Sequence, residues 1–81
     1  MEKVTSVTPL PDGYVSVVLQ SGAAGTFDVK PYMGSSFFAG LKDATYFKQV
    51  RLVFRGIGWP DGQDIGPDTI AAELVPLAQA A

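Results

Sequence analysis

Three aspartates, Asp61, Asp64 and Asp68, lie close together and are the residues whose type and spacing could do chemistry. Neighbouring carboxylates can act as a general acid and base, or they can bind a metal ion. Folding alone explains two of them, because Trp59-Pro60-Asp61-Gly62 is typical of a type I turn and Gly66-Pro67-Asp68 of a helix start. A carboxylate that accepts backbone hydrogen bonds stays ionised, whereas a general acid needs a raised pKa. We therefore predict structural roles, and the spacing also lacks the alternating ligands of a calcium loop.

Other catalytic chemistries lack the residues that they need. The chain contains no His and no Cys, which excludes disulfides, thiolate nucleophiles and the commonest base and metal ligand at neutral pH. No serine lies in a nucleophile-elbow motif, and Gly56, Gly58 and Gly62 are not followed by the Lys-Ser or Lys-Thr of a phosphate-binding loop. We predict no catalytic residue, no metal and no cofactor, so the chain is not expected to be an enzyme.

Charge and hydropathy favour a protein as the partner. The 81 residues are 47% hydrophobic and only 17% charged, which leaves apolar side chains for a partner or a second copy of the chain to cover. The net charge is -2, and the six Lys and Arg residues are scattered, which disfavours binding to nucleic acid. No segment approaches the roughly 20 apolar residues of a membrane span, and the start resembles no signal peptide. We expect a cytoplasmic protein.

The pattern of apolar residues predicts one α+β domain over residues 1–81. It consists of a small, mostly antiparallel sheet, with a three-strand meander and one or two further strands, and of two or three short helices. The meander strands are expected at Lys3–Thr8, Tyr14–Gln20 and Gly25–Val29, with Val15, Val17, Leu19, Phe27 and Val29 facing the core.

The second half of the chain mixes helices and strands. Helical segments are expected around Phe37–Leu41, at Ala44–Gln49 with Asp43 as N-cap, and from Pro67 to about Val75, where Ile65 and Ile70 have the spacing of a hydrophobic staple. A fourth strand at Val50–Arg55 alternates Val50, Leu52 and Phe54 with Arg51, Val53 and Arg55, the second set facing solvent or a partner. Arg55–Gly58 fits either a tight hairpin or a bulged strand, and residues 76–81 form a tail that we expect to fray.

Four residues are candidates for contacting a protein partner, namely Arg51, Val53, Arg55 and Trp59. The first three share the outer face of the fourth strand. Trp is favoured both at interfaces and in small cores, and we favour the core for Trp59 because it offers the largest area for burial in so small a domain.

Several segments together resemble the bacterial family known as domain of unknown function 2442, over about residues 2–75. They are Val4–Pro11, Leu19–Gly22, Phe27–Pro31, Leu41–Asp43 with Phe47 and Val50-Arg51, Trp59–Gly62, Asp64-Ile65 and Pro67–Ile70. The resemblance implies a small α+β fold without known catalytic residues or cofactor. It also implies a small partner protein encoded alongside, often of the family known as domain of unknown function 4160, in a toxin and antitoxin-like arrangement.

We therefore expect a non-catalytic protein-binding module, the antitoxin-like member of a two-gene pair. The alternative is one subunit of a dimeric transcriptional regulator that contacts DNA through Arg51 and Arg55.

Overall fold

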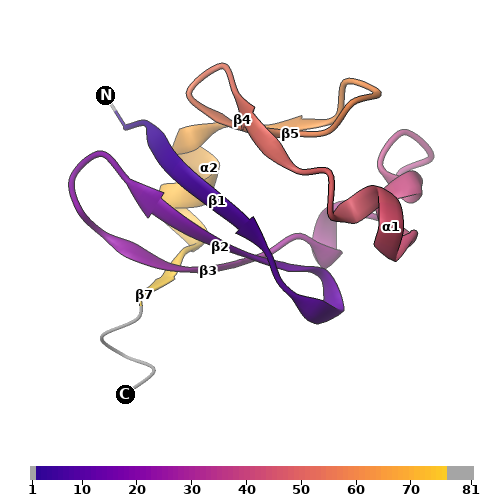
Figure 1. The fold of residues 1–81 in the computed structure, drawn as a ribbon, viewed down its shortest axis with the longest axis horizontal. Coiled ribbons are helices and arrows are strands. Elements are labelled where there is room, and N and C mark those ends of the chain that lie inside the picture. Colours follow the sequence, from indigo (N-terminus) through magenta and orange to yellow (C-terminus); the bar gives the residue numbers. More distant parts are fainter. Residues whose placement is uncertain (1, 77–81) are drawn as a thin grey trace.

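The computed structural model describes residues 2–76, which form two antiparallel sheets and short helices (Figure 1). In chain order the strands and α-helices are β1 (Val4–Pro9), β2 (Tyr14–Leu19), β3 (Ala24–Asp28), α1 (Ala44–Phe47), β4 (Arg51–Val53), β5 (Gly56–Gly58), β6 (Asp64–Ile65), α2 (Pro67–Glu73) and β7 (Val75–Pro76). Three 3-10 turns lie at Pro11–Gly13, Lys30–Tyr32 and Ala39–Lys42. The predicted α+β class is confirmed, but the strands divide between two sheets.

The first sheet contains the predicted meander, with strand order β1-β2-β3-β7. Val15 pairs with Phe27 and Val17 with Gly25, so that alternate residues face the same side. The predicted core face is confirmed, because the side chains of Val15, Val17, Leu19, Phe27 and Val29 are all buried.

The end of the last helix differs from the prediction. Helix α2 begins at Pro67 as expected but ends at Glu73, and Val75 pairs with Thr26 of β3. Pro76 disfavours helical geometry at Val75, and Leu74 before it is already extended, with a φ of -62° and a ψ of 134°. Gly25 makes the pairing feasible, because a Cβ there would overlap the Val75 carbonyl oxygen. Pro76, the first residue of the predicted tail, pairs with Gly25 rather than fraying, and the rest of that tail, residues 77–81, lies outside the described residues.

The second sheet has the order β4-β5-β6 and corrects the predicted fourth strand. That strand stops at Val53, and Phe54 and Arg55 form the two-residue turn of a tight hairpin, in which Val53 pairs with Gly56. The hairpin is therefore the correct alternative for Arg55–Gly58. The alternation placed Phe54 with Val50 and Leu52 on the face opposite the exposed one, and this is wrong, because Phe54 lies in the turn, where the alternation no longer applies.

Local signals in the last third of the chain are confirmed. The Gly62 N–H donates to the Trp59 carbonyl oxygen at 3.0 Å, which closes the predicted turn, and Gly62 has a φ of 100°. Ile65 and Ile70 are both buried, as expected of a hydrophobic staple around the start of α2. In α1 the Asp43 carboxylate accepts from the Thr45 N–H at 2.9 Å, so the predicted cap is confirmed, although the helix ends at Phe47, earlier than expected.

The core joins the two sheets. Its largest fully buried side chains include Trp59, Phe27, Leu41, Ile57 and Ile70, which come from both sheets, from α2 and from the Ala39–Lys42 turn. Helix α2 contacts β3 and β5, and β1 contacts β4. The N-terminal strand is therefore fixed against the hairpin of the second sheet, whereas α1 lies at the opposite end of the molecule (Figure 1).

Candidate functional site

The β4–β5 hairpin carries the most exposed large apolar side chain among the described residues. Phe54 at its turn is 86% exposed, and Leu52 in β4 is 48% exposed. Arg51 and Arg55 are exposed beside them. We call these four residues, Arg51, Leu52, Phe54 and Arg55, the hairpin patch.

The turn that presents Phe54 has an unfavourable backbone conformation. Phe54 has a φ of 48° and Arg55 a φ of 72°, values typical of a type I′ turn, which normally takes Asn-Gly. Each residue other than Gly, Asn or Asp costs roughly 1–2 kcal/mol in this left-handed region. Such strain persists only where the surrounding structure enforces it, and it gathers at functional sites.

Two contacts enforce this turn. The Val4 N–H of β1 donates to the Arg55 carbonyl oxygen at 2.7 Å, which attaches the turn to the first sheet. Gly56 packs so closely against β6 that a Cβ would overlap the Ile65 carbonyl oxygen. The hairpin therefore holds Phe54 in solvent on a fixed backbone.

Of the predicted partner contacts, Arg51 and Arg55 are exposed in the hairpin patch, but Trp59 and Val53 are not. Trp59 is 1% exposed, its indole Nε1 donates to the Phe47 carbonyl oxygen at 3.0 Å, and its ring lies 5.8 Å from that of Phe47. The core prediction is confirmed, and a surface role for the Trp59 side chain is wrong. Val53 is half-buried, because it packs over the face of β5 that Gly58 leaves open.

The alternating pattern did not predict that Leu52 and Phe54 are exposed. Leu52 pairs with the fully buried Ile57, yet it lies on an edge strand, where the core covers only part of the side chain. Nothing in the local sequence predicted a turn at Phe54, because Phe followed by Arg is typical of a strand, whereas a type I′ turn normally contains Asn or Gly.

The three aspartates are dispersed and exposed. Asp61 and Asp68 occupy the turn and the first turn of α2, and Asp64 lies in β6. Within residues 2–76, no three acidic, His or Cys side chains lie close enough to hold a metal ion.

Near Asp61, a polar network connects α1 to the second sheet. Gln63 is 4% exposed, and its amide oxygen accepts from the Tyr46 hydroxyl at 2.7 Å. The same hydroxyl accepts from the Asp61 N–H at 2.8 Å, and the Gln63 amide nitrogen donates to the Phe37 carbonyl oxygen at 3.0 Å. Every polar atom of the buried amide is used, so the network is structural.

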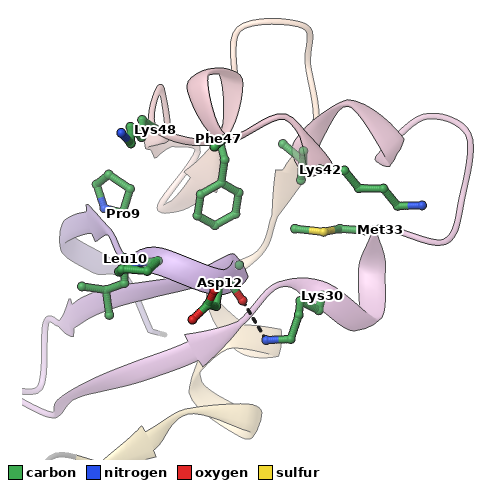
Figure 2. A pocket seen from close by; sticks show the side chains of 12 residues that line it. Pro9, Leu10, Asp12, Lys30, Met33, Lys42, Phe47 and Lys48 are labelled. Atoms are coloured by element: carbon green, nitrogen blue, oxygen red, sulfur yellow. Dashed lines mark hydrogen bonds between the residues drawn. The ribbon is translucent and has the colours of Figure 1, made fainter.

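An open cleft of about 950 Å³ lies beside α1, away from the hairpin patch (Figure 2). It separates the β1–β2 turn from the segment that holds α1. Its lining consists of Pro9, Leu10, Pro11, Asp12, Gly13, Lys30, Met33, Leu41, Lys42, Ala44, Phe47 and Lys48. Sequence reasoning missed this cleft, because segments distant in the chain form it.

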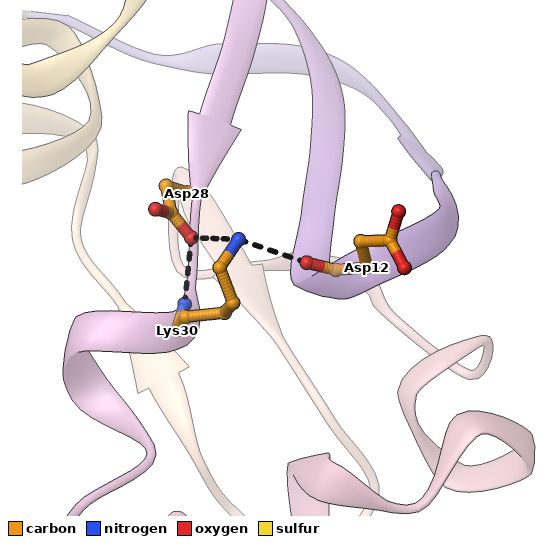
Figure 3. Close-up of polar contacts among 3 residues, drawn as sticks. All are labelled: Asp12, Asp28 and Lys30. Carbon is orange, nitrogen blue, oxygen red and sulfur yellow. Dashed lines mark hydrogen bonds and ion pairs between the residues drawn. The ribbon is translucent and has the colours of Figure 1, made fainter.

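Lys30 braces the β1–β2 turn against β3 (Figure 3). Its Nζ donates to the Asp12 carbonyl oxygen at 2.9 Å, lies 3.0 Å from the Asp28 carboxylate, and sits 3.7 Å above the Tyr14 ring. Desolvation lowers the pKa of Lys30, but the contacts with Asp28 and Tyr14 outweigh it and raise the pKa above its ordinary value. The Lys30 ammonium therefore has a structural role, which is to hold the β1–β2 turn in place.

Comparison with known proteins identifies a family but no characterised relative. No curated protein and no solved structure matches the chain. In the part that the structure describes, no helix has the length and hydropathy to cross a bilayer. One family model matches residues 4–76, which covers both sheets and both helices described above. The chain therefore belongs to the family described as Protein of unknown function (DUF2442).

Proposed function

We propose that this chain is a non-catalytic protein-binding module that contacts its partner through the hairpin patch. The observation that carries the proposal is Phe54, which is 86% exposed on a turn of two residues with positive φ. Backbone strain at an exposed aromatic residue has no evident benefit for folding. Strained backbone conformations are, however, common at binding sites.

The energetics of such a contact are favourable. Burying a Phe side chain contributes roughly 1.5–3 kcal/mol, and Leu52 beside it would add apolar area. The hairpin fixes the backbone of Phe54, so that little conformational entropy is lost on binding. Arg is enriched at interfaces, and Arg51 and Arg55 would surround the apolar centre with polar contacts.

We assign the partner and the setting from the family resemblance. The resemblance supports an antitoxin-like role in a two-gene pair, with a partner of the family known as domain of unknown function 4160. The mechanism would be occlusion of a surface of that partner. The lack of Cys in the chain supports action in the cytoplasm.

Copurification from the native host tests the proposal, with tagged wild type and a Phe54→Asn variant analysed by mass spectrometry. Asn tolerates positive φ, so the variant keeps the turn while it removes the aromatic ring. We expect wild type to recover one abundant partner and Phe54→Asn to lose it.

Phe37→Asn is the matched control, because Phe37 is 55% exposed but lies outside the hairpin patch. It should retain the partner. Recovery of the bait alone with wild type would contradict the protein-binding function, and retention of the partner by Phe54→Asn would contradict the assigned surface.

A further inference from the structure

The cleft at the α1 end is preformed. The Leu10 N–H donates to the Tyr14 carbonyl oxygen and the Val29 N–H to the Gly13 carbonyl oxygen, both at 2.9 Å. Together with the Lys30 contact to Asp12, these bonds hold the β1–β2 turn as a fixed wall. On the opposite side, the Leu41 N–H donates to the Phe38 carbonyl oxygen at 3.0 Å and the Phe47 N–H to the Asp43 carbonyl oxygen at 2.8 Å, so that local hydrogen bonds hold this wall as well.

The floor of the cleft is apolar. Met33, Leu41 and Phe47 are buried members of the core that line it, and Leu10 and Pro9 add partly buried apolar surface. Pockets for small ligands have this character, with an apolar lining and a few polar groups that fix the ligand's orientation.

The charged groups of the lining are mostly cationic. Lys30, Lys42 and Lys48 line the cleft together with a single acid, Asp12, although the chain as a whole has a net charge of -2. Lys30 is paired with Asp28, but in the described part of the chain neither Lys42 nor Lys48 forms an ion pair. Figure 2 shows these two lysines on either side of Phe47.

We propose that this cleft binds a small organic anion with an apolar body, such as a medium-chain carboxylate. The hydrocarbon would lie against Met33, Leu41 and Phe47, and its carboxylate would be held by Lys42 or Lys48. The site is separate from the hairpin patch and does not depend on the proposed partner.

A small molecule fits this cleft better than an extended peptide. Peptides that add to a sheet need an exposed strand edge, whereas the lining here comes from turns and α1, apart from Pro9 at the end of β1. The volume of about 950 Å³ also lies within the range typical of small-ligand pockets.

Trp59 provides an intrinsic reporter. The Phe47 side chain lines the cleft, and its ring lies 5.8 Å from the indole of Trp59, the only Trp in the chain. A ligand that packs against Phe47 should therefore change the emission of Trp59. Amide NMR shifts of Leu41 and Phe47 would locate the binding site independently.

The experiment is a titration of the 81-residue chain with sodium decanoate below its micelle concentration. We expect saturable changes in Trp59 emission and in the Leu41 and Phe47 amide shifts. The double variant Lys42→Gln/Lys48→Gln should bind roughly two- to fivefold more weakly, as expected for the loss of one exposed ion pair, whichever of the two lysines holds the carboxylate. Lys3→Gln, which removes a lysine outside the cleft, should bind like wild type.

Three results would overturn the proposal. One is the absence of saturation, or shifts that map away from the cleft. Another is equal binding of decanol, or unchanged affinity in the double variant, because either result would exclude recognition of the charge. The third is saturable binding in the cleft by a short peptide of alternating Leu and Glu without binding of decanoate, which would make the occupant a protein segment.

Discussion

Replacing Trp59 with Phe should destabilise the fold strongly without disrupting it. The substitution removes the bond from the indole Nε1 to the Phe47 carbonyl oxygen, whose net contribution is about 1 kcal/mol. The same carbonyl oxygen also accepts from the Val50 N–H at 3.3 Å, so it stays paired and the penalty for an unsatisfied group is avoided. The smaller ring leaves space in the core, which adds about 1–2 kcal/mol.

The expected total is therefore about 2–3 kcal/mol for Trp59→Phe, compared with about 3–5 kcal/mol for Trp59→Ala. A domain of this size has a total free energy of unfolding of roughly 4–12 kcal/mol, so the Phe variant should remain folded and the Ala variant should be close to unfolding. Urea unfolding followed by far-UV circular dichroism measures the difference. With a slope of about 1 kcal/mol per molar urea, the midpoint for Trp59→Phe should fall by about 2–3 M.

The surface variant Phe37→Leu serves as the control, and its midpoint should move by less than about 0.5 M. A shift that small for Trp59→Phe would refute the reasoning. It would mean that the indole contributes neither a hydrogen bond nor packing to the core.

Three other predictions test the hairpin, the pH dependence and the alternative function. Phe54→Asn should raise the free energy of unfolding by about 1 kcal/mol, because Asn relieves left-handed strain, and a lower urea midpoint would contradict the described turn. The hydrogen bond to Glu73 raises the pKa of Tyr32, so its stabilisation should be present below about pH 10 and be lost as the pH rises through the folded-state pKa. Tyr32→Phe should therefore show a weaker alkaline loss of stability than wild type, and parallel curves would contradict this. In a gel-shift assay at low salt, micromolar protein should not retard its own upstream DNA, and a specific shift would favour the dimeric regulator.

The sequence was informative wherever a residue restricts its own backbone or repeats with a fixed period. Pro60 and Gly62 predicted a turn, Asp43 predicted a helix cap, and Ile65 with Ile70 predicted a staple, because each signal acts over a few residues. Period-2 alternation predicted the meander and its core face for the same reason. For the candidate site, such reasoning supplied the two arginines of the hairpin patch.

Only the tertiary structure decided the rest of the site. Phe54 and Arg55 adopt positive φ because Val4 binds the Arg55 carbonyl oxygen and Gly56 packs against Ile65, contacts between segments far apart in the chain. These contacts outweigh the strand propensity of Phe54, which is only a weak preference. The alternating pattern therefore wrongly placed Phe54 in a strand. The cleft likewise depends on how the β1–β2 turn and α1 meet, which no local pattern encodes.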